Sequence, residues 1–117
     1  TIIFDENNEL FLITGSPGGS DIPAAILRVI TGVIDFDLDI GQATMLPRVH
    51  KDWPTTGILY ERTLNSDVVR IINKRIGHKM TAEHTMGSTQ SIHVIDQTNH
   101  GFADLRRPNA SVSVQTN

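Results

Sequence analysis

Two short apolar runs separated by a polar tetrapeptide open the chain. Residues 1–4 and 10–14 have the composition of strands and residues 5–8 that of a turn, so the pattern predicts a β-hairpin. Both strands are apolar at consecutive positions, which favours burial on both faces, between a second sheet and a helix layer. Residues 22–34 then leave almost no polar face, which predicts a buried helix.

Apolar and aspartate residues alternate without a break over residues 34–40. The alternation imitates a strand, and its three aspartates imitate a calcium loop. A calcium loop beginning at Asp35 requires glycine and glutamate at its sixth and twelfth positions, where this chain has Ile40 and Leu46. We therefore expect Asp39 to cap a short helix over residues 40–46 that ends before Pro47.

The second half of the chain predicts further strands and one amphipathic helix. An irregular segment over residues 47–54 carries Trp53, which we expect to pack as a lid over the core. A strand follows over residues 58–62, and then a helix capped by Asn65 or Ser66 that ends at Gly77. Three more strands are expected over residues 78–81, 86–95 and 99–103, before a polar tail.

The junction between the second strand and the buried helix holds consecutive glycines. Gly18 and Gly19 let the backbone turn sharply and approach a ligand closely, while Ser20 is expected to cap the helix and Pro23 fits its first turn. Backbone N–H groups at a helix N-terminus suit a developing negative charge, so the turn fits an oxyanion hole or a phosphate cradle. The pattern alone also fits an ordinary tight turn, because no complete phosphate-binding fingerprint is present.

Composition limits the functional classes. The chain has 117 residues, the size of one domain or part of one, with 13 acidic against 10 basic residues and no cysteine. The scattered charges form no patch for nucleic acid or for an anionic membrane, and no transmembrane run or signal peptide is visible. The absence of cysteine excludes disulfides and thiolate chemistry but leaves the compartment undecided.

The histidines and serines of the chain are candidate metal ligands and catalytic groups. The histidines lack the close pair spacing of zinc sites, and no cysteine supplements them, so we expect neither a metal site nor a cofactor. They are His50, His78, His84, His93 and His100. A triad of Ser88, His93 and Asp104 is disfavoured, because no nucleophile-elbow sequence surrounds any serine.

Several separated stretches resemble the small subunit of gamma-glutamyltranspeptidases, in the same order as in that family. Residues 12–20 (Leu-Ile-Thr-Gly-Ser-Pro-Gly-Gly-Ser) resemble its glycine-pair motif. Further similar stretches are residues 42–44 (Gln-Ala-Thr), 47–50 (Pro-Arg-Val-His), 86–92 (Met-Gly-Ser-Thr-Gln-Ser-Ile) and 101–107 (Gly-Phe-Ala-Asp-Leu-Arg-Arg). The chain departs from the family at Leu105, where the family usually has proline, which puts the local turn in question.

The resemblance implies an α+β fold, part of the αββα sandwich of N-terminal-nucleophile hydrolases made by autoproteolysis. Residues 1–117 then form a single fragment, the C-terminal portion of the small subunit. Its nucleophilic threonine and the serine pair that holds the substrate lie upstream of Thr1, and further substrate-binding residues belong to the large subunit. Of the catalytic apparatus, the resemblance assigns to this chain only the backbone N–H groups of Gly18 and Gly19, as the oxyanion hole.

The implied partners are the missing small-subunit residues, the large subunit, and glutathione or another γ-glutamyl substrate. Family resemblance implies a periplasmic or secreted location, and the apolar surfaces of the fragment favour self-association. Two alternatives remain open: a noncatalytic binding or scaffold module, and a related acylase or capsule depolymerase on the same scaffold. Upstream sequence with a nucleophilic threonine and a serine pair distinguishes the enzyme from the scaffold.

Overall fold

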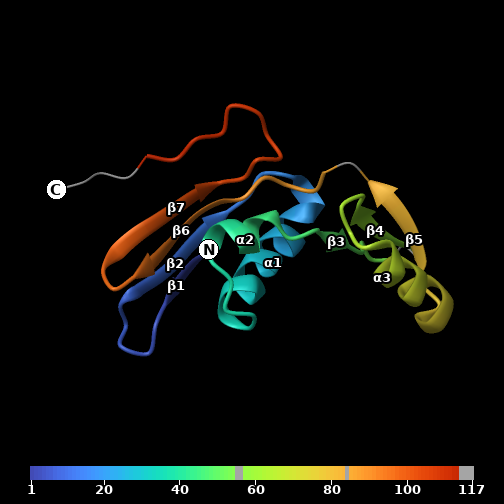
Figure 1. Cartoon of the computed structure of the whole chain (residues 1–117), viewed down its shortest axis with the longest axis horizontal. Coiled ribbons are helices and arrows are strands. Elements are labelled where there is room, and N and C mark those ends of the chain that lie inside the picture. The colour runs from blue at the N-terminus through green and yellow to red at the C-terminus, as the bar shows by residue number, and fades with distance from the viewer. Residues whose placement is uncertain (55–56, 84, 114–117) are drawn as a thin grey trace. The chain divides into compact units, whose positions relative to one another are not determined.

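The computed structural model describes residues 1–54, 57–83 and 85–113 (Figure 1). By its internal contacts the chain forms two compact units, one comprising Thr1–Leu46 with Gly87–Asn117 and the other Pro47–Met86. Helices and strands occur in both units, which confirms the α+β class. Each unit is described separately below.

The first unit contains a four-stranded antiparallel sheet in the order β1-β2-β6-β7 (Figure 1). The predicted hairpin is formed by β1 (Ile2–Phe4) and β2 (Leu10–Gly15). Its turn is stabilised by the Asp5 carboxylate, which accepts hydrogen bonds from the N–H groups of Asn7 and Glu9. The second hairpin, β6 (Gln90–Ile95) and β7 (Thr98–Ala103), pairs with β2 through β6.

Two helices cover one face of this sheet. The predicted long helix is α1 (Ile22–Ile34), and the short one is α2 (Ile40–Met45). Asp39 caps α2 as expected: its carboxylate accepts from Gln42 N–H, while the Gln42 side chain accepts from Asp39 N–H. The core joins side chains from β2 and both helices, namely Leu12, Val29, Val33, Ile40 and Ala43.

The other face of the sheet is not covered in the way that the sequence pattern predicted. Ile2 and Phe4 of β1 are 60% and 55% exposed, so the hairpin is not buried on both faces within this chain. The helix α1 likewise buries one stripe and leaves Leu27 and Ile34 exposed. The apolar composition of these elements therefore exceeds what the described residues bury.

The second unit contains a three-stranded sheet in the order β3-β4-β5. β3 (Val49–His50) pairs antiparallel with β4 (Gly57–Glu61), and β4 pairs parallel with β5 (Lys79–Glu83). The crossover between the parallel strands is α3 (Ser66–Ile71), which continues as the π-helical η2 (Ile72–Ile76). Asn65 caps α3 by accepting from Asp67 N–H, and Gly77 ends η2 at φ 81°, both as predicted.

Three local predictions for the second half were wrong. Trp53 is 92% exposed and covers no core in the described residues. Residues 49–50 form a strand rather than an irregular segment, because β4 offers them a pairing edge that local sequence does not reveal. The strand expected from residue 86 begins only at Gln90, since the preceding residues bend around Gly87, whose φ is 64°. No helix in the described ranges is long and apolar enough to span a membrane.

Candidate active-site turn

The glycine pair lies where the sequence placed it, between the end of β2 and the start of α1. Gly18 has φ 139° and Gly19 has φ 64°, so both residues use backbone conformations that favour glycine. Residues 19–21 then form a short 3-10 helix, η1 (Gly19–Asp21), that leads into α1. The physical requirement for two consecutive glycines is therefore a property of the backbone at this turn.

The expected cap of α1 was wrong. Ser20 lies inside η1, and the N-cap position belongs to Asp21, whose side chain makes no capping hydrogen bond. The 3-10 turn is the physical reason, because it satisfies the Asp21 and Ile22 N–H groups with the carbonyls of Gly18 and Gly19. Pro23 occupies the first turn of α1, as predicted.

The N–H groups of the two glycines remain available to a ligand. Both residues are exposed, and neither N–H donates a hydrogen bond to any residue in the described part of the chain. Unpaired backbone donors next to the N-terminus of a 13-residue helix favour a negatively charged or polarised oxygen. The turn therefore has the chemistry of an anion or oxyanion site.

The hydroxyl of Ser16, which the sequence did not single out, makes two hydrogen bonds next to this turn. Ser16 Oγ donates to the Pro17 carbonyl oxygen at 2.7 Å and accepts from Ser88 N–H at 3.0 Å. The turn also packs on Gly87, because a Cβ atom on Gly18 would lie 3.3 Å from Gly87 Cα. Residues 12–20 and 86–92 both resemble motifs of the family, but only the fold shows that Ser16 and Gly18 contact residues 87 and 88.

A second cluster connects three of the other family-like stretches within the first unit. The guanidinium of Arg106 donates to the carbonyls of Thr44 and Leu46 at 2.9 Å each, at the end of α2. It also pairs with the buried carboxylate of Asp104 at 3.1 Å, and the other oxygen of that carboxylate accepts from Thr89 N–H. Arg106 thus satisfies carbonyls at a helix C-terminus, which a cation stabilises.

The turn at Leu105 forms without the proline usual in the family. Arg107 N–H reaches the Asp104 carbonyl at 3.4 Å, and Arg106 N–H donates to the Asp104 carboxylate at 3.0 Å. The Leu105 side chain is 68% exposed, so the residue type at this position does not affect the core. The departure from the family pattern therefore leaves the cluster intact.

In the second unit, Glu61 connects residues near the two ends of the unit, Arg48 and Met86. Its carboxylate accepts from Arg48 N–H and from Met86 N–H, at 2.9 Å each. The Arg48 guanidinium donates to the Met86 carbonyl at 2.6 Å, and both charged side chains are almost fully buried. Because an isolated buried charge is costly, these hydrogen bonds to the backbone offset part of the cost of burying the two charged side chains.

The structure places most of the histidines and the carboxylate that the sequence offered as candidate catalytic groups or metal ligands. The Asp104 carboxylate is bonded to Thr89 and Arg106, while His93 Nδ1 is buried without a hydrogen-bond partner among the described residues. His50 pairs with Asp52 at 2.8 Å, and His84 lies outside the described residues. Within the described ranges, no group of three or more histidine, aspartate or glutamate residues is placed to hold a metal ion.

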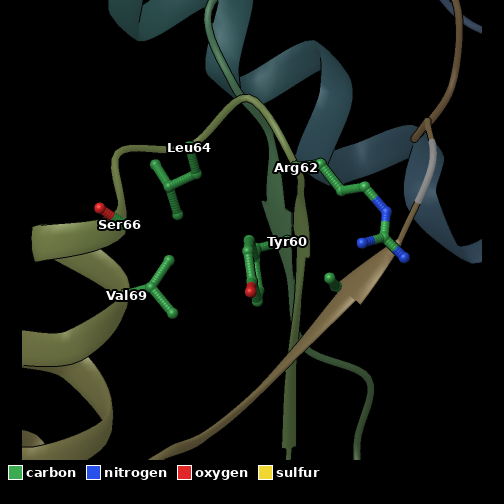
Figure 2. A pocket seen from close by; sticks show the side chains of 6 residues that line it. Tyr60, Arg62, Leu64, Ser66 and Val69 are labelled. Atoms are coloured by element: carbon green, nitrogen blue, oxygen red, sulfur yellow. The ribbon is translucent and has the colours of Figure 1, made fainter.

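A hollow of about 220 Å³ lies in the second unit, between β4, β5 and the start of α3 (Figure 2). Figure 2 shows the Tyr60 ring facing Val69 across it, with Leu64 above and the Arg62 side chain pointing away. Ser66 and Ala82 complete the lining. Among the described residues that line this hollow there is no carboxylate and no histidine, the usual general acids and bases of a hydrolytic site.

The chain resembles known proteins along nearly its whole length. The family model described as gamma-glutamyltranspeptidase matches residues 1–114. The glutathione hydrolase proenzyme of Escherichia coli is 35% identical over 102 residues, which cover 86% of this chain, and that of Bacillus subtilis is 30% identical over 117 residues, which cover 97%. A solved gamma-glutamyltranspeptidase mutant from Helicobacter pylori superposes with a TM-score of 0.85 at 32% identity, over 92% of this chain.

These matches also define how much of the relatives the chain represents. It spans 17% of the Escherichia coli protein and 19% of the Bacillus subtilis protein. Of the solved Helicobacter pylori chain it spans 59%. Most of each of the two curated relatives therefore lies outside the matched region.

Proposed function

The chain belongs to the gamma-glutamyltranspeptidase family, and we propose that its Gly18–Gly19 turn is the oxyanion hole of a γ-glutamyl-transferring enzyme. The observation that carries the proposal is the pair of unpartnered N–H groups at positive-φ glycines next to the start of α1. The proposed substrate is glutathione or another γ-glutamyl compound, held together with parts of the protein outside this chain.

In the proposed reaction a threonine hydroxyl outside this chain attacks the γ-carbonyl carbon of the substrate. The carbonyl oxygen gains negative charge in the tetrahedral intermediate and accepts hydrogen bonds from Gly18 and Gly19. Collapse of the intermediate breaks the carbon–nitrogen bond, so the amine leaves with a proton and a γ-glutamyl ester remains on the threonine. Water or an acceptor amine then attacks the carbonyl carbon of the ester, and a second tetrahedral oxyanion forms. Its collapse breaks the ester bond, so the γ-glutamyl product leaves and the threonine hydroxyl regains its proton.

Backbone donors suit this role for an energetic reason. They are held in place by the turn before the reaction begins, so little reorganisation is needed when charge develops. The start of α1 adds the positive end of a helix dipole near the same point. Loss of one such donor typically lowers the rate by about a hundred- to a thousand-fold.

The test uses the complete protein and a γ-glutamyl nitroanilide, a γ-glutamyl anilide whose cleavage releases a coloured amine. Alanine keeps the backbone N–H but is strained at φ 139° and 64°, so each substitution should shift the turn and misdirect its donors. We expect Gly18→Ala and Gly19→Ala to lower kcat by about a hundred-fold and to change KM by much less, because the interaction forms mainly in the transition state. The extent of precursor cleavage is measured on a gel, and kcat is expressed per cleaved molecule. Unchanged kcat in both variants would exclude the oxyanion role.

A further inference from the structure

We propose that Ser16 is a positioning residue that aims the Gly18 N–H at the oxyanion. The proposal rests on the proposed function of the turn and adds a side chain to it. Its structural basis is the hydrogen bond from Ser16 Oγ to the Pro17 carbonyl oxygen, 2.7 Å long. Pro17 C=O and Gly18 N–H are the two ends of one peptide group.

A peptide group is planar, so its carbonyl and its N–H rotate together. Among the described residues the only cis peptide bond is Trp53–Pro54, so the Pro17–Gly18 bond is trans and its N–H points opposite to its carbonyl. A hydroxyl that holds the Pro17 oxygen therefore sets the direction of the Gly18 N–H. Ser16 acts on the donor without touching the substrate.

The direction of both Ser16 hydrogen bonds follows from the chemistry of their partners. Ser88 N–H can only donate, so Ser16 Oγ is the acceptor in the 3.0 Å contact between these residues, which are 72 positions apart in the chain. The Pro17 carbonyl can only accept, so the hydroxyl proton points toward it. The Ser88 N–H thus holds the Ser16 hydroxyl oxygen in place, and the Ser16 hydroxyl in turn holds the Pro17–Gly18 peptide group.

Close packing leaves the hydroxyl little room to move. A Cβ atom on Gly87 would lie 2.6 Å from Ser16 Oγ, and a Cβ atom on Gly18 would lie 3.3 Å from Gly87 Cα. Ser88 itself is almost fully buried. Gly87 and Ser88 therefore pack directly against the serine and the glycine turn.

Without the hydroxyl, the Pro17–Gly18 peptide keeps no side-chain restraint in the described structure. Glycine at the next position offers little steric resistance to rotation of that peptide, because it tolerates positive and negative φ. The Gly18 N–H would then spend part of its time away from the oxyanion. The catalytic cost is smaller than the loss of a donor, since the N–H is still present.

The experiment compares Ser16→Ala with Thr31→Ala in the complete, cleaved protein. Thr31 is a matched control, because its hydroxyl also donates to a backbone carbonyl, that of Arg28 in α1, at 3.3 Å. We expect Ser16→Ala to lower kcat about tenfold, below the hundred-fold or greater loss expected for a missing donor, with KM within about twofold. Thr31→Ala should leave both constants unchanged.

A second measurement separates positioning from general stability. A boronic acid analogue of the γ-glutamyl group forms a tetrahedral adduct that places an oxygen at the oxyanion position, so its affinity should fall by the same factor as kcat. Unchanged kcat in Ser16→Ala, an equal loss in Thr31→Ala, a loss confined to KM, or failure of Ser16→Ala to be cleaved would each overturn the proposal.

The glycine variants distinguish this inference from the proposed function. If Gly18→Ala and Gly19→Ala lower kcat while Ser16→Ala does not, the oxyanion hole stands and only the role of Ser16 is wrong. If neither glycine variant lowers kcat, the function proposed for the turn fails, and the role of Ser16 fails with it.

Discussion

Gly32 of α1 lies directly against Ala43 of α2: a Cβ atom on Gly32 would be 2.8 Å from the Ala43 Cβ and 3.2 Å from its Cα. Both residues are buried, and Ala43 belongs to the core cluster. The glycine therefore sets how closely the two helices approach. Its cost to helix stability, about 1 kcal/mol relative to alanine, is offset by this contact.

Gly32→Ala should destabilise the complete protein by about 1–3 kcal/mol, because overpacking outweighs the gain in helix propensity. Gly15→Ala is the matched control, since no atom lies within 4 Å of the position where its Cβ would be. Chemical denaturation of both variants measures the effect. A Gly32→Ala protein that is as stable as the wild type would mean that the helices can separate without cost.

Acid should weaken the first unit through His93. Burial, and secondly the charge of His100 opposite it, lower the pKa of His93 below its usual value. A histidine with a lowered pKa in the folded state binds its proton more readily when unfolded, so protonation favours unfolding. The ring of Phe11 packs edge-on against His93, with 4.7 Å between the ring centroids, and it carries no negative charge that would stabilise the protonated imidazole.

We therefore expect the unfolding temperature to fall as the pH drops below about 6.5, the usual pKa of histidine. His93→Gln should reduce that dependence between pH 7 and pH 5. His78→Gln, which changes a histidine of the other unit, serves as the control. Equal pH dependence in wild type and His93→Gln would show that other groups dominate.

The isolated chain should self-associate or fold only marginally. The sheet face opposite the helices exposes Ile2 and Phe4, and Leu27 and Ile34 of α1 are exposed as well. Exposed apolar side chains on both sides of this unit favour association, because they remove apolar surface from water when they are covered. Sedimentation at several concentrations, together with a thermal melt, tests this; a monomer that unfolds cooperatively would be the contrary result.

The isolated chain should also lack γ-glutamyl transfer activity, although it begins with threonine. The Thr1 amine donates to the Thr14 carbonyl at 2.9 Å, and Thr14 N–H donates back to the Thr1 carbonyl at 3.0 Å, so Thr1 is engaged in the β1–β2 pairing. An N-terminal nucleophile needs its amine as a base.

Incubation with a γ-glutamyl anilide and with a threonine-directed electrophile, followed by intact-mass measurement, checks this prediction. We expect no released amine and no adduct. Product release with an adduct on Thr1 that Thr1→Ala abolishes would instead make this chain an enzyme in its own right.

Local signals in the sequence determined much of the fold and the location of the candidate site. The hairpin, the bounds of α1 and the Asp39 cap follow from periodicity and from side chains that bond within a few residues of themselves. The need for glycine at residues 18 and 19 is equally local, because it depends on the φ angles of one turn. The family assignment also needed only the order of short motifs.

The tertiary structure alone decided which distant groups meet. Ser16 touches Ser88 and Arg106 reaches Thr44 only because strands and helices far apart in sequence pack together. The exposure of Trp53 and of one sheet face could not be predicted from the sequence either. An apolar side chain favours burial, but whether it is buried depends on which neighbours the fold places against it. Hydrogen-bond partners and burial are long-range properties, and they become known only when the fold brings the partners together.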